Sequence, residues 1–207
     1  MLGAMSHVTR STRSTLREMV EQGAPAIDMS SLLDDLSPER RIDQVLAVRG
    51  ALIRRMYSLV GTGEPLGLDD IVPSSAPAGS TITYEGRNSL PLFSRFQKRF
   101  TRTADGLVFG YNHQPTPGVG ALTGPGYFAV TEADASHPGE LLFDYTKTPP
   151  FEPSGWPAWR ANESGGGRLV FMNLNDYVRR VARGVVVGIA LKLGKDQDAC
   201  FSLTRAY

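Results

Sequence analysis

The sequence predicts a mainly β, α+β fold in which an N-terminal helical segment packs on an antiparallel β-barrel of about eight or nine strands. Two observations lead to this prediction. Apolar residues recur at three- and four-residue spacing over residues 38–60, which is the period of an amphipathic helix. Beyond residue 79, short runs rich in Phe, Tyr, Val and Thr alternate with turn-forming clusters about every ten residues, as antiparallel strands do.

The composition is that of one globular domain. Apolar residues make up 41% and charged residues 21% of the 207 positions, which is enough apolar surface to bury a core. We expect a flexible or weakly helical segment over residues 1–36 and a single domain over residues 37–207. Within that domain we expect a helix at 38–60, an irregular connector at 61–79 and the barrel at 80–207.

The long helix has well-marked ends. Ser37 is a suitable N-cap, Pro38 can occupy the first helical position without losing a hydrogen bond, and Glu39 suits the first turn. Gly61 and Gly63 then predict its end, because glycine favours the left-handed backbone that terminates helices.

The strands are predicted from short apolar runs between turns. Asp105-Gly106 and Arg183-Gly184 are dipeptides that tight hairpins favour, and they join neighbouring runs. An open sheet of this many strands would expose unpaired edges, so a closed barrel is favoured. One helical turn before the first hairpin is suggested by the spacing of Leu92, Phe93, Phe96 and Phe100. The expected strands are residues 81–85, 98–103, 107–112, 126–131, 140–146, 168–173, 176–182, 185–191 and 199–205.

Charge and cysteine content exclude several classes of protein. The 22 basic and 21 acidic residues give a net charge of +1, so nucleic acid is not an expected partner. No run approaches the roughly 18 to 20 apolar residues that span a bilayer, and no membrane role is expected. Cys200 is the only cysteine, which suits a reducing, cytoplasmic location. Residues 1–17 are rich in Arg, Ser and Thr, as in either an organellar transit peptide or a frayed terminus.

Four positions are candidates for polar contacts with a ligand. Tyr111 and His113 belong to a polar strand end that could line a barrel mouth, and Tyr127 begins a later strand. Arg180 shares one strand face with Asp176, and an inward arginine needs an anionic partner: Asp176, Asp144 or a ligand carboxylate. The alternative for the Tyr111–His113 stretch is an ordinary polar strand end.

His113 and Asp144 are the candidate catalytic acid or base. Leu141, Phe143 and Tyr145 share the apolar face of their strand, so Asp144 faces either solvent or a neighbouring strand. The three histidines are far apart in sequence and lack metal-ligand spacing, so we expect no metal site and no cofactor.

Residues 149–159 form the most unusual stretch, with four prolines and the aromatic residues Phe151, Trp156 and Trp159. Three interpretations stay open. The stretch is a loop packed on the barrel, a lid over a pocket, or a surface that binds a partner.

The C-terminal residues 176–190 and 201–205 resemble the closing strands of calycin-like barrels, the lipocalin-type superfamily. In that family a strand, a tight turn, a strand with a central glycine and an aromatic-containing last strand are common. The resemblance implies a cavity for a small, largely apolar ligand.

Three functions are compatible with the sequence. The first is binding of a small apolar or mixed-polarity molecule inside the barrel. The second is a cofactor-independent barrel enzyme, such as a cyclase, isomerase or hydratase of secondary metabolism. The third is a scaffold or interaction protein that uses residues 149–159 or the long helix. The oligomeric state is not indicated by the sequence.

Overall fold

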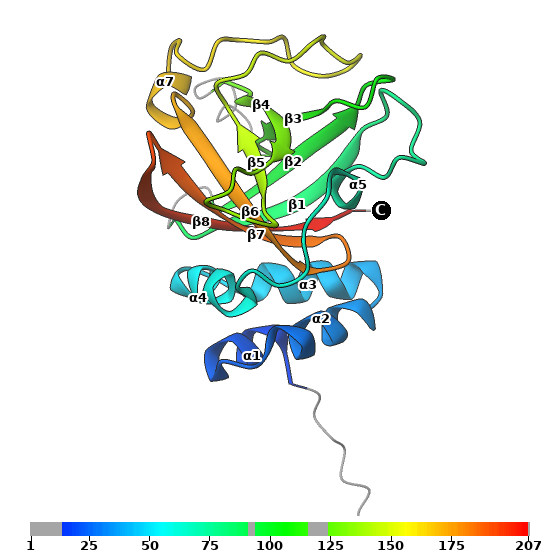
Figure 1. The fold of residues 1–207 in the computed structure, drawn as a ribbon, viewed down its shortest axis with the longest axis vertical. Coiled ribbons are helices and arrows are strands. Elements are labelled where there is room, and N and C mark those ends of the chain that lie inside the picture. The colour runs from blue at the N-terminus through cyan, green and yellow to red at the C-terminus, as the bar shows by residue number, and fades with distance from the viewer. Residues whose placement is uncertain (1–13, 91–93, 116–123, 207) are drawn as a thin grey trace, which may run out of the picture.

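The computed structural model describes residues 14–90, 94–115 and 124–206. Within these ranges, eight strands form one closed antiparallel barrel in which each strand pairs with the next and β8 pairs with β1 (Figure 1). The predicted fold class is therefore confirmed. The strands are β1 (Ile82–Asn88), β2 (Arg95–Arg102), β3 (Val108–His113), β4 (Tyr127–Glu132), β5 (Leu141–Asp144), β6 (Leu174–Ala182), β7 (Val185–Lys192) and β8 (Lys195–Arg205).

Alternation along the strands divides inner from outer side chains. In β2, Phe96, Lys98 and Phe100 point into the barrel and are buried, and in β5 Leu141 and Phe143 do the same. The interior is mainly aromatic and aliphatic and forms one continuous cluster. The barrel is thus built around a packed apolar core.

Four helices cover the outer face of β6, β7 and β8 (Figure 1). They are α1 (Leu16–Gln22), α2 (Ala26–Asp34), α3 (Pro38–Ala47) and α4 (Ala51–Val60). Their apolar faces share a second buried cluster with Val181, Val185, Val187 and Cys200 of the sheet. These three strands therefore bury side chains on both faces. The helical segment packs on the side of the barrel.

The helix predicted over residues 38–60 is two helices. Ser37 caps α3 as predicted, with its hydroxyl accepting from the Arg40 amide at 3.5 Å. The chain then leaves the helix at Val48, which is extended, and turns at Gly50, whose φ is +55°. Only a glycine adopts that backbone easily. The break therefore depends on the backbone conformation of Gly50, which the spacing of apolar residues does not indicate.

Residues 14–36 are more ordered than the expected flexible or weakly helical segment. Thr15 and Glu18 form a reciprocal capping box that starts α1. The buried Arg41 side chain donates to the carbonyl oxygens of Leu33 at 2.9 Å and of Arg183 at 3.2 Å. This arginine therefore ties the end of α2 to the β6–β7 turn.

The connector over residues 61–79 closes one end of the barrel. It contains a short helix, α5 (Leu68–Ile71), and places Leu66 and Val72 in the barrel core. The Tyr84 hydroxyl donates to the carbonyl oxygens of Asp70 and Ile71 at 3.0 and 3.1 Å. We call this the α5 end of the barrel.

The strand predicted at residues 168–173 is wrong, because the structure has a short helix there, α7 (Gly167–Val170). β5 and β6 already pair with one another, so the closed sheet offers no edge to a further strand. Residues 145–173 instead form a long connection between β5 and β6, and its last part, which contains α7, lies at the opposite end of the barrel, the α7 end (Figure 1).

The two predicted hairpin turns are confirmed. Gly106 has a φ of +94° between β2 and β3, and Gly184 has a φ of +69° between β6 and β7. The predicted helical turn is wrong for Phe96 and Phe100, which lie in β2. A spacing of four residues puts side chains on the same face of a strand as well as of a helix. Leu92 and Phe93 lie outside the described residues.

Candidate functional site

A cluster of polar side chains is buried inside the barrel towards its α7 end. It consists of Lys98 of β2, Asn112 of β3, Tyr145 just after β5 and Asp176 of β6. Lys98 and Asn112 are direct partners in the β2–β3 register, so strand alternation turns both side chains inward together. We refer to these four residues as the Lys98 cluster.

The Lys98 ammonium has an acceptor for each of its three N–H groups. Its Nζ donates to Asn112 Oδ1 at 2.8 Å, to Asp176 Oδ2 at 3.1 Å and to the Tyr145 hydroxyl. Lys98 is 2% exposed and Asp176 is 3% exposed, so both ends of this ion pair are removed from water. A buried lysine of this kind persists only where its charge is paired and its donors are satisfied.

The remaining members of the cluster are held by further hydrogen bonds. The Tyr145 hydroxyl donates to Asp176 Oδ2 at 3.1 Å. Asn112 Nδ2 donates to the Gly126 carbonyl oxygen at 3.0 Å and lies 3.1 Å from the Tyr145 hydroxyl. The cluster thereby links β2, β3 and β6 to the residue that follows β5 and to the backbone just before β4.

Aromatic rings surround the lysine nitrogen. Five ring centroids lie 4.7 to 5.8 Å from Nζ, distances at which the ring faces attract a cation. The five rings belong to Phe96, Phe128, Phe143, Tyr145 and Phe201.

Burial perturbs the pKa values of all three titratable members. Loss of solvation lowers the pKa of Lys98, although the charge of Asp176 opposes this. Loss of solvation also raises the pKa of Asp176, against the attraction of Lys98, and raises the pKa of Tyr145. The two shifts of the ion pair act in the same sense, because both reduce the cost of moving a proton from Lys98 to Asp176.

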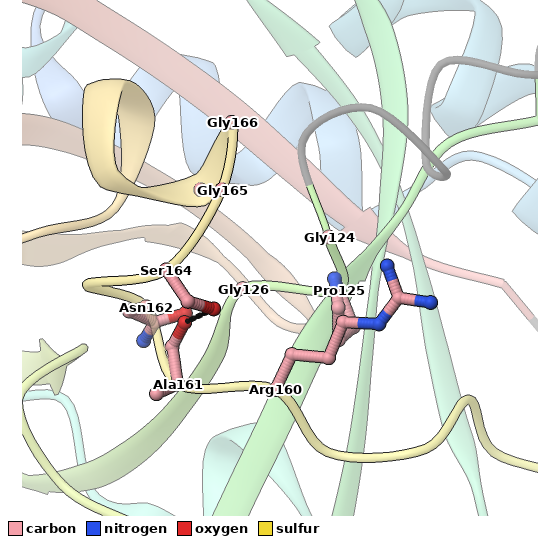
Figure 2. Close-up of a pocket in the computed structure, with 10 residues that line it drawn as sticks. Gly124, Pro125, Gly126, Arg160, Ala161, Asn162, Ser164, Gly165 and Gly166 are labelled. Carbon is pink, nitrogen blue, oxygen red and sulfur yellow. Dashed lines mark hydrogen bonds between the residues drawn. The ribbon is translucent and has the colours of Figure 1, made fainter.

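A pocket of about 340 Å³ lies at the α7 end, outside the cluster (Figure 2). Two stretches line it, residues 124–126 and residues 160–167 without Glu163. Figure 2 shows Gly165 and Gly166 on one side of this pocket and Gly124 on the other. Its polar groups are the side chains of Arg160, Asn162 and Ser164 and the backbone, so the lining is of mixed polarity.

Phe171 lies beside both the pocket-lining Gly126 and the cluster residue Tyr145. Its ring is parallel to the Tyr145 ring, with the centroids 5.5 Å apart. A Cβ built on Gly126 would lie 2.6 Å from the Phe171 ring, so the ring lies against the backbone that lines the pocket. Phe171 follows α7, and its amide donates to the Gly167 carbonyl oxygen at 2.7 Å. The position of this ring therefore depends on a helix of four residues.

Asn162 anchors the segment that carries α7. Its Nδ2 donates to the carbonyl oxygens of Tyr127 at 2.9 Å and Tyr145 at 2.7 Å. The side chain is buried, and it fixes one rim of the pocket to the ends of β4 and β5.

Three of the residues predicted to contact a ligand lie on the outer face of the barrel. Tyr111 and Tyr127 are buried there with Phe109, beneath Trp156. His113 is half-buried on the same face, with its ring 6.2 Å from Tyr111. These side chains cannot line the interior, because period-two alternation turns Gly110 and Asn112 inward instead.

The side chains of Arg180 and Asp144 bond to partners outside the Lys98 cluster. Arg180 donates to Asp70 and to the Pro65 carbonyl oxygen at 3.0 Å, so it is paired at the α5 end. The predicted anionic partner was Asp176, Asp144 or a ligand, and the structure corrects this to Asp70 of the connector. Asp144 accepts from the amide and hydroxyl of Thr146 at 2.8 and 2.6 Å. Their roles in binding or catalysis stay predictions.

The proline-rich stretch 149–159 packs on the barrel, which was the first of its three interpretations. Trp156 donates from Nε1 to Thr81 Oγ1 at 2.8 Å, and its ring lies 4.7 Å from that of Tyr111. Phe151 packs on Phe109 with a centroid distance of 5.3 Å. The stretch thus covers the outer aromatic cluster.

Sequence reasoning did not assign Lys98 to a site. The alternation Phe96, Lys98, Phe100 was a usable signal, since it puts a lysine between two inward phenylalanines. Placing Phe96 in a helical turn concealed that signal.

The fold and the site define a closed eight-stranded barrel with an ionisable cluster inside one end and a pocket outside it. In the described ranges no three His, Cys, Asp or Glu residues are grouped closely enough to hold a metal ion. None of the helices in those ranges has the length and apolar character that crossing a bilayer requires. Comparisons with protein-family models, curated proteins and solved structures give no match.

Proposed function

We propose that the protein binds a small molecule of mixed polarity at the α7 end of its barrel. The pocket of about 340 Å³ that lies against Asn162 and Gly126 carries this proposal. Such a volume falls within the range of small-molecule sites, roughly 300 to 1,000 Å³. The closed eight-stranded barrel is also compatible with a calycin-like protein, whose members hold small ligands. That likeness is one of architecture alone.

The lining of the pocket suggests the polarity of the ligand. The exposed Arg160 supplies donors, and the exposed Ser164 hydroxyl, which donates to the Ala161 carbonyl oxygen at 2.7 Å, can accept a hydrogen bond. Pro125 supplies apolar contacts, and the glycines leave the backbone open. A ligand with an aromatic or aliphatic body and one acidic or polar group suits these surroundings better than a purely apolar one.

Binding of 1-anilinonaphthalene-8-sulfonate, an aromatic anion that fluoresces in apolar surroundings, tests the proposal. Ser164→Trp fills the pocket, and Ser58→Trp makes the same change on the exposed face of α4. We expect saturable binding to the wild type and to Ser58→Trp, and at least about tenfold weaker binding to Ser164→Trp, a difference of about 1.4 kcal/mol. Equal affinities for the two variants, or no saturable binding to the wild type, would refute a site in this pocket.

A second candidate function is catalysis without a cofactor. The observation that favours it is the convergence of three titratable groups, Lys98, Tyr145 and Asp176, within hydrogen-bond distance of one another. An isomerase, cyclase or hydratase needs an acid and a base so arranged. His113 and Asp144 stay alternative catalytic candidates, and turnover that survives His113→Ala would remove His113. A scaffold role stays the third possibility.

A further inference from the structure

Lys98 combines a nucleophilic nitrogen with two neighbouring proton-carrying groups, the Asp176 carboxyl and the Tyr145 hydroxyl. Its primary amine is the only lysine nitrogen that the described structure buries, since Lys147 and Lys195 are exposed and Lys192 is half-buried. Asp176 Oδ2 and the Tyr145 hydroxyl both lie within hydrogen-bond distance of it. An amine and two acids around one point are the groups that condensation with a carbonyl compound requires.

We propose that Lys98 forms an imine with an aromatic or conjugated aldehyde or ketone that enters from the pocket at the α7 end. This inference rests on the proposed function, because the same pocket must admit the carbonyl compound. It adds the ligand class and the atom to which the ligand becomes bonded.

The chemistry balances with the groups present. Lys98 passes one proton to Asp176, and the neutral amine attacks the carbonyl carbon to form a carbinolamine, its oxygen gaining a proton as the nitrogen loses one. Asp176 then protonates the departing hydroxyl group, which leaves as water. The product is a protonated imine whose positive charge faces the Asp176 carboxylate, as the ammonium did before. No oxidant or reductant takes part.

The surroundings of Lys98 suit a conjugated ligand. Burial disfavours the charged forms of both Lys98 and Asp176, lowering the pKa of the amine and raising that of the carboxyl, which assists the initial proton transfer. The five rings around Nζ present apolar faces that can stack on an unsaturated body and attract the cationic imine.

Phe171 controls access in this scheme. Its ring lies between the Gly126 backbone of the pocket and the Tyr145 ring of the cluster. α7 contains only four residues, and its Leu169 side chain is 82% exposed. It is held by a hydrogen bond from Lys192 Nζ to the Leu169 carbonyl oxygen at 2.7 Å and by the burial of the following Phe171 in the barrel core. Withdrawal of α7 would carry Phe171 with it and join the pocket to the space beside Tyr145.

Reductive trapping tests the proposal. The full-length folded protein is incubated with cinnamaldehyde and cyanoborohydride at neutral pH, and the modified lysines are located by peptide mass spectrometry. The exposed Lys147 is the internal control, because an ordinary lysine is almost fully protonated at this pH. We expect adducts on Lys98 in preference to Lys147 in the wild type. Phe171→Ala should raise the Lys98 rate about tenfold and leave the Lys147 rate unchanged.

The outcomes separate this inference from the proposed function. Cinnamyl alcohol has the same body without a carbonyl group and reports binding alone, by displacing anilinonaphthalene sulfonate. If the alcohol displaces the dye but both the wild type and Phe171→Ala carry adducts only on surface lysines, the imine proposal is overturned and the pocket stands. If the dye does not bind to the wild type, the proposed function fails as well. The wild type is itself a test sample, so the result does not depend on the folding of a variant.

Discussion

Replacing one member of the buried Lys98–Asp176 pair should destabilise the fold strongly. Asp176→Asn keeps the shape of the side chain and removes its charge, leaving an ammonium that is 2% exposed without a counterion. Breaking a buried ion pair in this way costs about 3 to 5 kcal/mol. For a chain of this size, that corresponds to a fall in Tm of about 6 to 20 °C.

The two single replacements should respond to pH in opposite directions. In Lys98→Met the buried Asp176 carboxyl keeps a raised pKa, so between about pH 3.9 and that pKa the folded state binds more protons than the unfolded state. The stability of Lys98→Met therefore falls as pH rises through this window. In Asp176→Asn the pKa of Lys98 is lowered, so between that lowered pKa and about pH 10.4 the unfolded state binds more protons than the folded state. The stability of Asp176→Asn therefore rises with pH.

Urea unfolding followed by circular dichroism at about pH 5.5, 7 and 9 measures these effects. Glu21→Gln is the control, because Glu21 forms an exposed pair with Arg17 and its loss should cost no more than about 0.5 kcal/mol. A loss below about 1 kcal/mol for Asp176→Asn, or pH slopes of the same sign for both variants, would refute a desolvated ion pair.

Three further changes test other parts of the structure. Gly110→Ala should lower the free energy of unfolding by about 1 to 3 kcal/mol, because the new Cβ would lie 2.5 Å from a backbone carbonyl oxygen of β2. Gly67→Ala is the control: the atom nearest to its new Cβ is 3.6 Å away, and the free energy of unfolding measured in urea should change by under about 0.5 kcal/mol. Burial raises the pKa of the Cys200 thiol to about 11, so between pH 9 and 11 the folded state holds the proton longer. The wild type should therefore lose up to about 2 to 3 kcal/mol relative to Cys200→Ala as pH rises through that window, and parallel pH profiles would contradict this. Trp156→Phe removes the hydrogen bond to Thr81 and should cost about 1 kcal/mol; a Thr81→Val double-mutant cycle with no coupling would show that the bond contributes nothing.

The sequence predicted the barrel because its signals are local. Asp105-Gly106 and Arg183-Gly184 are turn dipeptides, and each strand between turns shows its own alternation. Antiparallel neighbours joined by short turns follow from those signals without knowledge of distant contacts. The break at Gly50 and the α7 helix did not follow. The break depends on the positive φ of one residue, Gly50, and the α7 helix depends on the closed sheet having no free edge for a further strand.

The Lys98 cluster could not be assembled from the sequence because its members are far apart in the chain. Lys98 and Asp176 are 78 positions apart, and their meeting depends on the register of the closed barrel. Alternation alone places Lys98 inward once β2 is extended back to Phe96. Asp176 was predicted to share a strand face with Arg180, and in β6 Asp176 does point inward. The two residues nevertheless have different partners: Asp176 pairs with Lys98 towards one end of the barrel, and Arg180 pairs with Asp70 of the connector at the other end.

The two ends of the barrel are closed by different means, and this difference supports our proposal that a ligand binds at the α7 end. At the α5 end, apolar side chains of the connector enter the core, Tyr84 bonds two connector carbonyl groups, and Arg180 is paired with Asp70. Opening that end would break all of these interactions together. At the α7 end the ring of Phe171 covers Tyr145, and α7, on which that ring depends, is one turn long. Since the pocket also lies there, we propose that a ligand entering the interior would do so past Phe171.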